Sequence, residues 1–466
     1  MTYEEALEYI NGANRFGKKL GLQNIRMLLK MMGDPQKELR FVHIAGTNGK
    51  GSTSAFIASI LAQAGYRTGI YTSPYLQRFT ERIAVSGPAV AQLDDSGSGN
   101  GARQGDIPET ARRTYREEIG KEELAGITSL VRDCADEMAE SGEYRPIMFE
   151  IVTAVALEYY RRKKCDIVVL ETGMGGRFDA TNAIDVPDLA VITTISKDHT
   201  PRLGNTLQEI AFEKAGIIKA GGDVLVYDQA PEIMQVFEDA CRERGARLHR
   251  ADFSKIRLHD FGPDGQTFSY AGLDGLKIAL IGRHQLRNAA IAIEAAMILK
   301  NKGWNISEPD IRDGLEAARW PGRMEILSKD PVVLIDGAHN PEGAAVLRKT
   351  LDEYFPGKPL TFIVGIAADK DYRTMLEKTL PGCRKVITVT VPSDRALPAD
   401  VLAEHASRYC NDVMISDTIE GAVKTGIATA KPDGVVCAFG SLYYIGAVRD
   451  MFSKQSGGEV FDGCEG

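Results

Sequence analysis

The chain has few of the features that mark several large classes of protein. Its seven cysteines are scattered and form no C-x-x-C pair, so the sequence predicts neither a zinc site nor a disulfide framework and fits a reducing compartment. No apolar run approaches the roughly 18 residues that a membrane-spanning helix needs. The first residues, MTYEE, have neither the basic start nor the apolar core of a signal peptide. We therefore expect a cytoplasmic protein with no membrane segment.

The chain also lacks an excess of positive charge. Fifty-six Lys and Arg residues stand against 64 Asp and Glu residues, and the net charge of −8 argues against a nucleic-acid surface. A hydrophobic content of 44% and a charged content of 26% are typical of a globular protein. The length of 466 residues exceeds what one core usually holds and indicates two or three domains.

One stretch near the N-terminus predicts a phosphate-binding element. Residues 41–45, FVHIA, form an expected buried strand, residues 46–52, GTNGKGS, a glycine-rich turn, and residues 52–64 a helix. Such a turn lets backbone N–H groups and the helix N-terminus approach an oxyanion. Lys50 could reach the outer phosphates and Ser52 could place a hydroxyl on Mg²⁺. The match to the P-loop pattern is imperfect, because Ile44 replaces the first glycine and Gly51 separates Lys50 from Ser52. A turn that binds no ligand is the alternative.

The remaining pattern alternates strands and helices, which predicts an α/β fold with a doubly wound, mostly parallel sheet. In the first half we expect a pair of short helices within 2–32, strands at 69–72, 166–170, 189–194 and 224–227, helices at 117–140, 149–162, 207–218 and 286–300, and short β-like runs over 245–280. In the second half we expect strands at 332–335, 361–364, 385–388, 412–415 and 435–439 and a helix at 342–354. A boundary near 301–306 would separate a domain of residues 1–303 from a smaller α/β domain of residues 304–466.

Two segments are expected to lie outside this framework. The stretch from Gly87 to about Gln104 contains many Gly, Ser and Asp residues, which predicts a mobile loop that packs on nothing. The last residues, SKQSGGEVFDGCEG, are expected to fray.

Polar motifs follow several of the expected strands, where ligands of parallel sheets bind. Glu171 begins the string ETGMGGRFDATN and could be a hard oxygen ligand for Mg²⁺. His199 ends the string ISKDH after the next strand. Each has an ordinary alternative, because glycine runs after strands are often only turns and a lone histidine is more often structural than a ligand.

Taken together, these strings resemble the Mur-ligase superfamily of ATP-dependent amide ligases. The resemblance is greatest to folylpolyglutamate synthase and dihydrofolate synthase, and it lies in GTNGKGS, TSPYLQRFTERI, ETGMGGRFDATN, DHTPRLG and EKAGI. These motifs cover most of residues 41–340 and recur to about residue 446. Tyr75 stands where the family pattern has histidine, which weakens the inference at that position alone.

The resemblance implies a role for each matching residue. The catalytic set is Lys50, Lys214 and His199, and the metal ligands are Ser52, Ser73, Glu171, His199 and Lys214 as a carbamate. The ATP-binding set is Thr47, Asn48, Gly49, Lys50, Gly51, Ser52, Asn288, Arg323, Asp336 and His339. The folate-binding set is Phe149, Glu150, Phe178, Asp179 and Ala180. Lys214 and Arg323 also have the ordinary alternative of a solvated surface charge.

The implied cofactor is Mg²⁺, with two ions expected. Mn²⁺ could substitute, since a histidine ligand is unusual for Mg²⁺. The implied substrates are ATP, L-glutamate and a folate or dihydropteroate, and the expected state is a monomer with no nucleic-acid or membrane partner.

The reaction implied by the resemblance is addition of glutamate to the γ-carboxyl of a folate through an acyl phosphate. Dihydrofolate synthase, alone or combined with the first activity, uses the same motifs. A wall-precursor ligase of the same superfamily fits the strings less well, and a P-loop ATPase that acts as a regulatory switch is the alternative from another class. The sequence identifies no general base for the glutamate amine.

Overall fold

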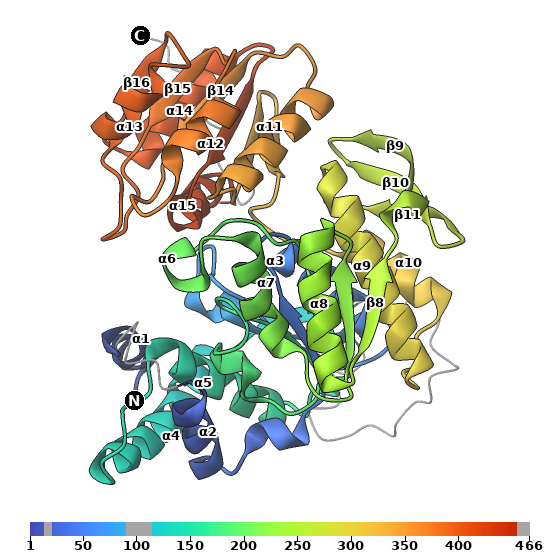
Figure 1. The fold of residues 1–466 in the computed structure, drawn as a ribbon. Coiled ribbons are helices and arrows are strands. Elements are labelled where there is room, and N and C mark those ends of the chain that lie inside the picture. The colour runs from blue at the N-terminus through green and yellow to red at the C-terminus, as the bar shows by residue number, and fades with distance from the viewer. Residues whose placement is uncertain (14–20, 90–113, 454–466) are drawn as a thin grey trace. The chain divides into compact units, whose positions relative to one another are not determined.

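The computed structural model describes residues 1–13, 21–89 and 114–453, and the chain divides into two compact units (Figure 1). The first unit contains Met1–Arg257, Phe268–Ile278 and Leu286–Ala318. The second contains Leu258–Thr267, Ala279–Gln285 and the chain from Arg319 onward.

The division after Ala318 falls later than the boundary expected at residue 303. The segment between them contains helix α10 (Glu308–Ala317), which packs on helix α3 (Lys50–Gln63) of the first unit. The two helices approach so closely that a Cβ on Gly314 would lie 2.5 Å from Cα of Ile60. This packing holds α10 in the first unit.

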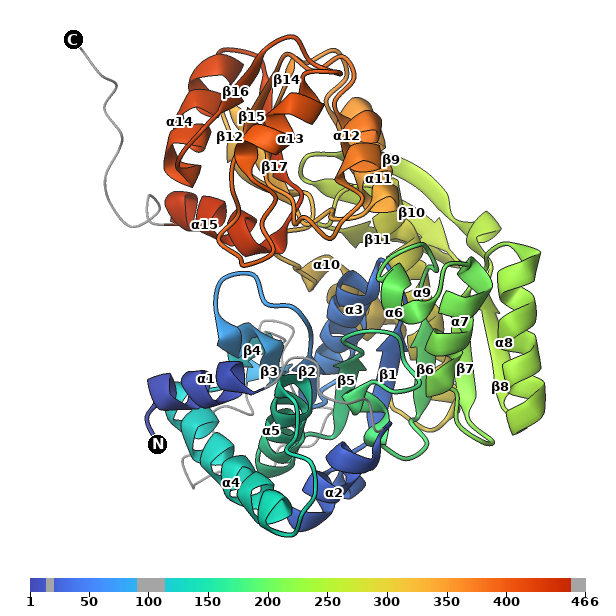
Figure 2. The same ribbon diagram turned by 60° about the vertical axis from the view of Figure 1, so that its left-hand side comes forward.

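The first unit is built on an eight-stranded sheet with the order β4-β3-β2-β5-β1-β6-β7-β8 (Figure 2). The strands are β1 (Phe41–Ala45), β2 (Thr68–Tyr71), β3 (Ile83–Pro88), β4 (Thr114–Glu118), β5 (Ile167–Glu171), β6 (Leu189–Ile192), β7 (Asp223–Tyr227) and β8 (Arg247–Ala251). All neighbours are parallel except β3 and β4 at one edge. The prediction of a mostly parallel, doubly wound sheet is confirmed.

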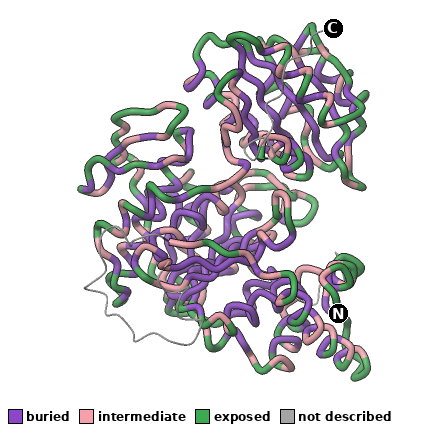
Figure 3. Tube along the Cα trace, turned by 180° about the vertical axis from the view of Figure 1, so that it is seen from behind, coloured by how far each residue is buried: buried purple, intermediate pink, exposed green. Residues whose placement is uncertain are grey.

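The helices of this unit bury the apolar strands. One core cluster joins β1, β2, β3 and β5 to α1 (Tyr3–Gly12), α2 (Gln23–Met31), α4 (Lys121–Glu140) and α5 (Met148–Arg162). A second cluster joins β6 and β7 to α7 (Leu207–Lys214) and α8 (Pro231–Arg244). Every residue of β1 is buried, so both faces of this strand are covered. Buried residues, drawn in purple, are concentrated inside each unit (Figure 3). The short α6 (Thr200–Leu203) follows β6, and α9 (Arg283–Asn301) precedes α10.

The second unit is built on a six-stranded sheet with the order β12-β13-β17-β14-β15-β16, parallel except for β12 at the edge. Its strands are β12 (Glu325–Lys329), β13 (Val332–Asp336), β14 (Leu360–Val364), β15 (Lys385–Thr388), β16 (Val413–Ile415) and β17 (Val435–Phe439). Its helices are α11 (Pro341–Tyr354), α12 (Tyr372–Thr379), α13 (Ala399–Ala406), α14 (Ile419–Ala430) and α15 (Leu442–Ser453). A three-stranded sheet has the order β11 (Leu273–Ile278), β10 (Gly265–Tyr270), β9 (Arg257–Gly262).

Several expected elements shift in the structure. Helix α3 begins at Lys50, two residues before the expected start, and strands β3 and β4 and helix α8 were not predicted. The expected loop from Gly87 was wrong at its start, because Gly87 and Pro88 belong to β3 and pair with Tyr115 and Thr114. The rest of that loop, apart from Ala89, and the chain beyond Ser453 lie outside the described residues. In the described ranges, no helix is both long and apolar enough to cross a membrane.

Candidate active site

The glycine-rich turn connects β1 to α3, and two of its glycines are required by the geometry. Gly49 precedes the helix with a φ of 86°, a left-handed conformation that favours glycine. Gly46 has a φ of 149°, and a Cβ there would lie 1.8 Å from Oγ1 of Thr193. Because α3 begins at Lys50, the N–H groups of its first turn point past the helix end without intrahelical acceptors. The turn therefore has the backbone geometry of an anion cradle.

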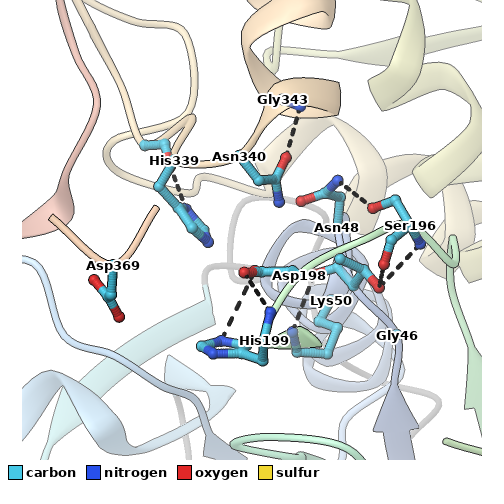
Figure 4. Close-up of polar contacts among 12 residues, drawn as sticks. Gly46, Asn48, Lys50, Ser196, Asp198, His199, His339, Asn340, Gly343 and Asp369 are labelled. Carbon is cyan, nitrogen blue, oxygen red and sulfur yellow. Dashed lines mark hydrogen bonds and ion pairs between the residues drawn. The ribbon is translucent and has the colours of Figure 1, made fainter. Parts of the chain in front are cut away.

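Two side chains of this turn hold it to the segment that follows β6 (Figure 4). The Thr47 hydroxyl donates to the Ser196 carbonyl at 3.1 Å and accepts from the Ser196 N–H at 3.1 Å. Asn48 Nδ2 donates to Ser196 Oγ at 3.2 Å. The structure thus gives Thr47 and Asn48 a bracing role in the loop, in addition to the predicted role at the nucleotide.

Lys50 faces a carboxylate from the neighbouring strand. Its Nζ lies 3.8 Å from Oε1 of Glu171, and the two side chains are 16% and 4% exposed. The same ammonium donates to the Thr47 carbonyl at 3.3 Å. Glu171 ends β5, which pairs with β1 so that Ile44 and Glu171 are partners. The sheet therefore brings the lysine of the turn and the predicted metal ligand together at one edge.

Lys214 lies beneath the turn. It ends α7, is 3% exposed, and donates from Nζ to the Gly46 carbonyl at 2.6 Å. Burial, with a smaller contribution from the nearby Lys50 charge, lowers the pKa of this amine to about 7, although Asp198 and Asp179 act in the opposite direction. The alternative of a solvent-facing lysine is excluded by this burial.

His199 and Ser73 come from two further strand ends. His199 precedes α6 with a φ of 52°, its N–H donates to Asp198 Oδ1 at 2.9 Å, and its Nε2 lies 3.8 Å from Asp198 Oδ2 (Figure 4). Ser73 follows β2, the other neighbour of β5, and is half-buried. Sequence reasoning assigned no role to Asp198, although its place beside His199 after a strand was a signal.

The donor set of this edge is poor in carboxylates. Across the described part of the chain, no three His, Cys, Asp or Glu side chains lie together in a way that could hold a metal ion. A metal at the predicted position would therefore need hydroxyl oxygens, a carbamate or substrate oxygens as well as Glu171. The predicted set, with Ser52, Ser73 and a modified Lys214, has this composition.

The residues predicted on the folate side divide into two groups. Asp179 is buried and accepts from Met174 N at 2.9 Å and Thr181 Oγ1 at 2.6 Å, and burial raises its pKa. Glu150 accepts from Ile147 N at 2.8 Å at the start of α5, and burial raises its pKa too. Both carboxyl groups are thus committed to hydrogen bonds within the protein.

The other three residues of that side are apolar. Phe178 is 45% exposed, Ala180 is buried, and the ring of Phe149 packs so closely on Gly173 that a Cβ there would lie 2.5 Å from the Phe149 Cζ. Phe178 is the member of this group that presents a large apolar surface to solvent.

Asn288, in α9, lies against the glycine-rich turn. It accepts a hydrogen bond from the Tyr227 hydroxyl, and a Cβ on Gly49 would lie 2.7 Å from its Oδ1. Helix α9 therefore places this predicted nucleotide residue directly beside the turn.

The remaining predicted residues belong to the second unit. Asp336 ends β13 and accepts from Met324 N at 2.9 Å and Ala338 N at 2.8 Å, and burial raises its pKa. His339 Nδ1 donates to the Gly337 carbonyl at 2.8 Å. Arg323 Nη1 donates to the Gly322 carbonyl at 3.3 Å. All three side chains lie around the loop after β13.

Comparison with known proteins adds independent findings. Residues 145–296 match the Mur ligase middle domain, and residues 322–442 match the Mur ligase, glutamate ligase domain. The chain is 35% identical to a dihydrofolate synthase/folylpolyglutamate synthase of Bacillus subtilis over 96% of the chain and 98% of the relative. It is 35% identical to a folylpolyglutamate synthase of Lacticaseibacillus casei with the same coverage. A solved structure of Mycobacterium tuberculosis folylpolyglutamate synthase complexed with ADP is 28% identical, with a TM-score of 0.82 over 97% of this chain and 98% of that one.

Proposed function

We infer the function from one premise: the chain belongs to the folylpolyglutamate synthase and dihydrofolate synthase family of Mur ligases. It is therefore an ATP-dependent ligase. We propose that it joins L-glutamate to the γ-carboxyl of a folate. The observation that carries this proposal is Lys50 at the start of α3, 3.8 Å from Glu171 at the end of β5.

The chemistry requires activation of a carboxylate, which is a poor electrophile. Transfer of the ATP γ-phosphoryl group to the folate carboxylate makes an acyl phosphate, whose phosphate is a good leaving group. The glutamate amine then attacks the carbonyl carbon, and the tetrahedral intermediate collapses to the amide with loss of phosphate. Lys50 and the N–H groups at the start of α3 stabilise phosphoryl charge as it moves.

A metal would be held by the side chains at the same sheet edge. We propose Glu171, His199, the hydroxyls of Ser52 and Ser73, and an oxygen donor on Lys214. Mg²⁺ at this position, as one or two ions, would neutralise phosphoryl charge, and Mn²⁺ would suit the histidine ligand.

The oxygen donor on Lys214 is proposed to be a carbamate. Its neutral amine would attack CO₂ and lose a proton, which turns a cation into an anion with two ligand oxygens. Burial under Gly46 supports this, because a permanent ammonium is costly there. The test is ¹³C NMR of protein equilibrated with ¹³C-bicarbonate. A carbamate signal is expected in the wild type and absent in Lys214→Gln, and equal spectra would contradict the assignment.

Roles at the substrates remain predictions for the other residues. We propose that Asn288, Arg323, Asp336 and His339 serve the nucleotide. We propose Phe149, Glu150, Phe178, Asp179 and Ala180 for the pterin side. Because Asp179 and Glu150 accept internal hydrogen bonds, their part is to shape the site as well as to contact the ligand.

One assay tests the proposed function. Purified protein receives MgATP and labelled L-glutamate, with tetrahydrofolate or dihydropteroate offered in parallel. Incorporation with tetrahydrofolate supports polyglutamylation, and incorporation with dihydropteroate supports the synthase activity, alone or in addition. ATP hydrolysis that needs neither a pterin nor glutamate would contradict both.

A further inference from the structure

The central strand of the first unit contains one buried histidine that the reaction does not use. His43 lies in the middle of β1, paired with Leu170 on one side and Ala190 on the other, and is 0% exposed. An imidazole in such a place costs free energy unless its polar atoms have partners. Its Nε2 lies 2.9 Å from Oγ1 of Thr181, which is 138 residues further along the chain.

The direction of the hydrogen bonds follows from the next contact. The Thr181 hydroxyl donates to Asp179 Oδ1 at 2.6 Å, so its single proton is committed to the carboxylate. The same oxygen must therefore accept from His43, which makes His43 the donor through an Nε2–H group. Nδ1 of this ring is buried and has no hydrogen-bond partner, as expected for a neutral ring with its proton on Nε2.

The chain of bonds continues from Asp179 to the loop that carries Phe178. With Oδ1 held by Thr181 Oγ1 and Thr181 N, Oδ2 accepts from Met174 N at 2.9 Å. This closes the segment from Met174 to Asp179 on itself beside the exposed Phe178 ring. Through Thr181, the bonds that close this segment are thus linked to a proton donated from the central strand.

We propose that His43 is a positioning residue for the pterin substrate, which it serves through Thr181 and Asp179 without touching the ligand. This inference rests on the proposed function, because it assumes that the loop of Phe178 and Asp179 forms the pterin side. Loss of the His43 donor lets the Thr181 hydroxyl turn and releases Asp179. The loop then loses its fixed shape, while the glycine-rich turn that follows β1 keeps its own bonds to Ser196.

The test compares Michaelis constants of His43→Leu, Thr181→Val and the double variant. His43→Leu removes the donor, and His43→Gln restores an amide donor of similar reach. We expect a ~10-fold higher KM for the pterin in both single variants, the scale of one lost buried network, with the KM for ATP changed less than twofold. The double variant should be no worse than either single variant, and His43→Gln should recover most of the loss.

A matched control separates this role from a general loss of stability. His249 in β8 also bonds a partner, Asp223 Oδ1, at 2.8 Å, but lies outside this loop. His249→Leu should lower the melting temperature without changing the KM for the pterin. The inference would be overturned if the Michaelis constants for the pterin, ATP and glutamate rose equally, or if the two substitutions had additive effects in the double variant. An unchanged KM for the pterin in Thr181→Val would also overturn it. Absence of glutamate ligation in the wild type would instead contradict the proposed function.

Discussion

Glu171 and Asp336 occupy the same place in two different sheets. Each is the last residue of a mostly buried strand, β5 in the first unit and β13 in the second. The Asp336 carboxylate accepts from two backbone N–H groups of its own unit, Met324 and Ala338. The Glu171 carboxylate instead lies 3.8 Å from the Lys50 ammonium, beyond hydrogen-bonding distance.

The difference shows how one position can serve structure or chemistry. Two backbone N–H donors fix the Asp336 carboxylate, which in turn holds the loop after β13 in place. Glu171 instead faces the ammonium of Lys50 in the glycine-rich turn, so phosphates that draw Lys50 away would change the charge beside its carboxylate. We therefore expect substitutions near Glu171 to change turnover and substitutions at Asp336 to change stability first.

The largest expected effect is at Lys50. Lys50→Met removes the cation opposite Glu171 and should lower ligase turnover by at least ~10²-fold, the scale for one lost charge-stabilising group. The fold should remain, because among the described residues the side chain makes a 3.3 Å bond and a 3.8 Å ion pair and no other polar contact. Steady-state kinetics and circular dichroism provide the measurements, with the exposed Lys37→Met as the control. Near-normal turnover in a folded variant would refute the phosphate-cradle assignment.

The next effect separates the two carboxylates directly. Asp336→Asn leaves one of two buried N–H groups without its acceptor, and should cost about 1–3 kcal/mol of unfolding free energy. Glu171→Gln keeps the size of the side chain and one acceptor oxygen, so it should change the unfolding free energy less than Asp336→Asn and still abolish most turnover. Urea unfolding of both variants checks the contrast. If Glu171→Gln were the less stable of the two variants, the proposed distinction between a structural Asp336 and a ligand-binding Glu171 would be wrong.

A third effect is a pH dependence at Lys214. Its pKa is lowered from 10.5 to about 7, so between these values the unfolded chain binds more protons than the folded chain. The unfolding free energy of the wild type minus that of Lys214→Met should therefore rise with pH across this window, by at most about 1.4 kcal/mol per pH unit. Urea unfolding from pH 6 to about pH 10 in CO₂-free buffer measures this. Parallel pH curves for the two proteins would show that the amine is solvated.

The smallest effect concerns two glycines with the same backbone conformation. Gly49 has a φ of 86° and Gly142 a φ of 85°, but only at Gly49 would a Cβ meet a neighbour, Asn288 Oδ1 at 2.7 Å. Both alanine variants should lose about 1 kcal/mol from left-handed strain. Only Gly49→Ala should also raise the KM for ATP, by a few-fold. An equal KM in the two variants would show that the turn does not contact the nucleotide.

Local patterns in the sequence determined much of the fold. Strand β1 was predicted to the residue because four of its five contiguous positions are apolar, and the glycines of the turn mark the start of α3. The strand-end position of Glu171 also follows from the sequence, since a buried apolar run ends there. In contrast, β3 and β4 were missed, because their pairing joins segments separated by residues with no strand pattern.

Only the tertiary structure decided the contacts between distant segments. Lys214 reaches the Gly46 carbonyl across 168 residues, and His43 reaches Thr181 across 138. The local sequence around Lys214 and His43 does not reveal these partners, because the burial of each side chain depends on distant segments that pack against it. The first unit likewise includes α10, since Gly314 admits the backbone of Ile60. The sequence determined which chemical groups follow each strand, and packing determined which of them meet.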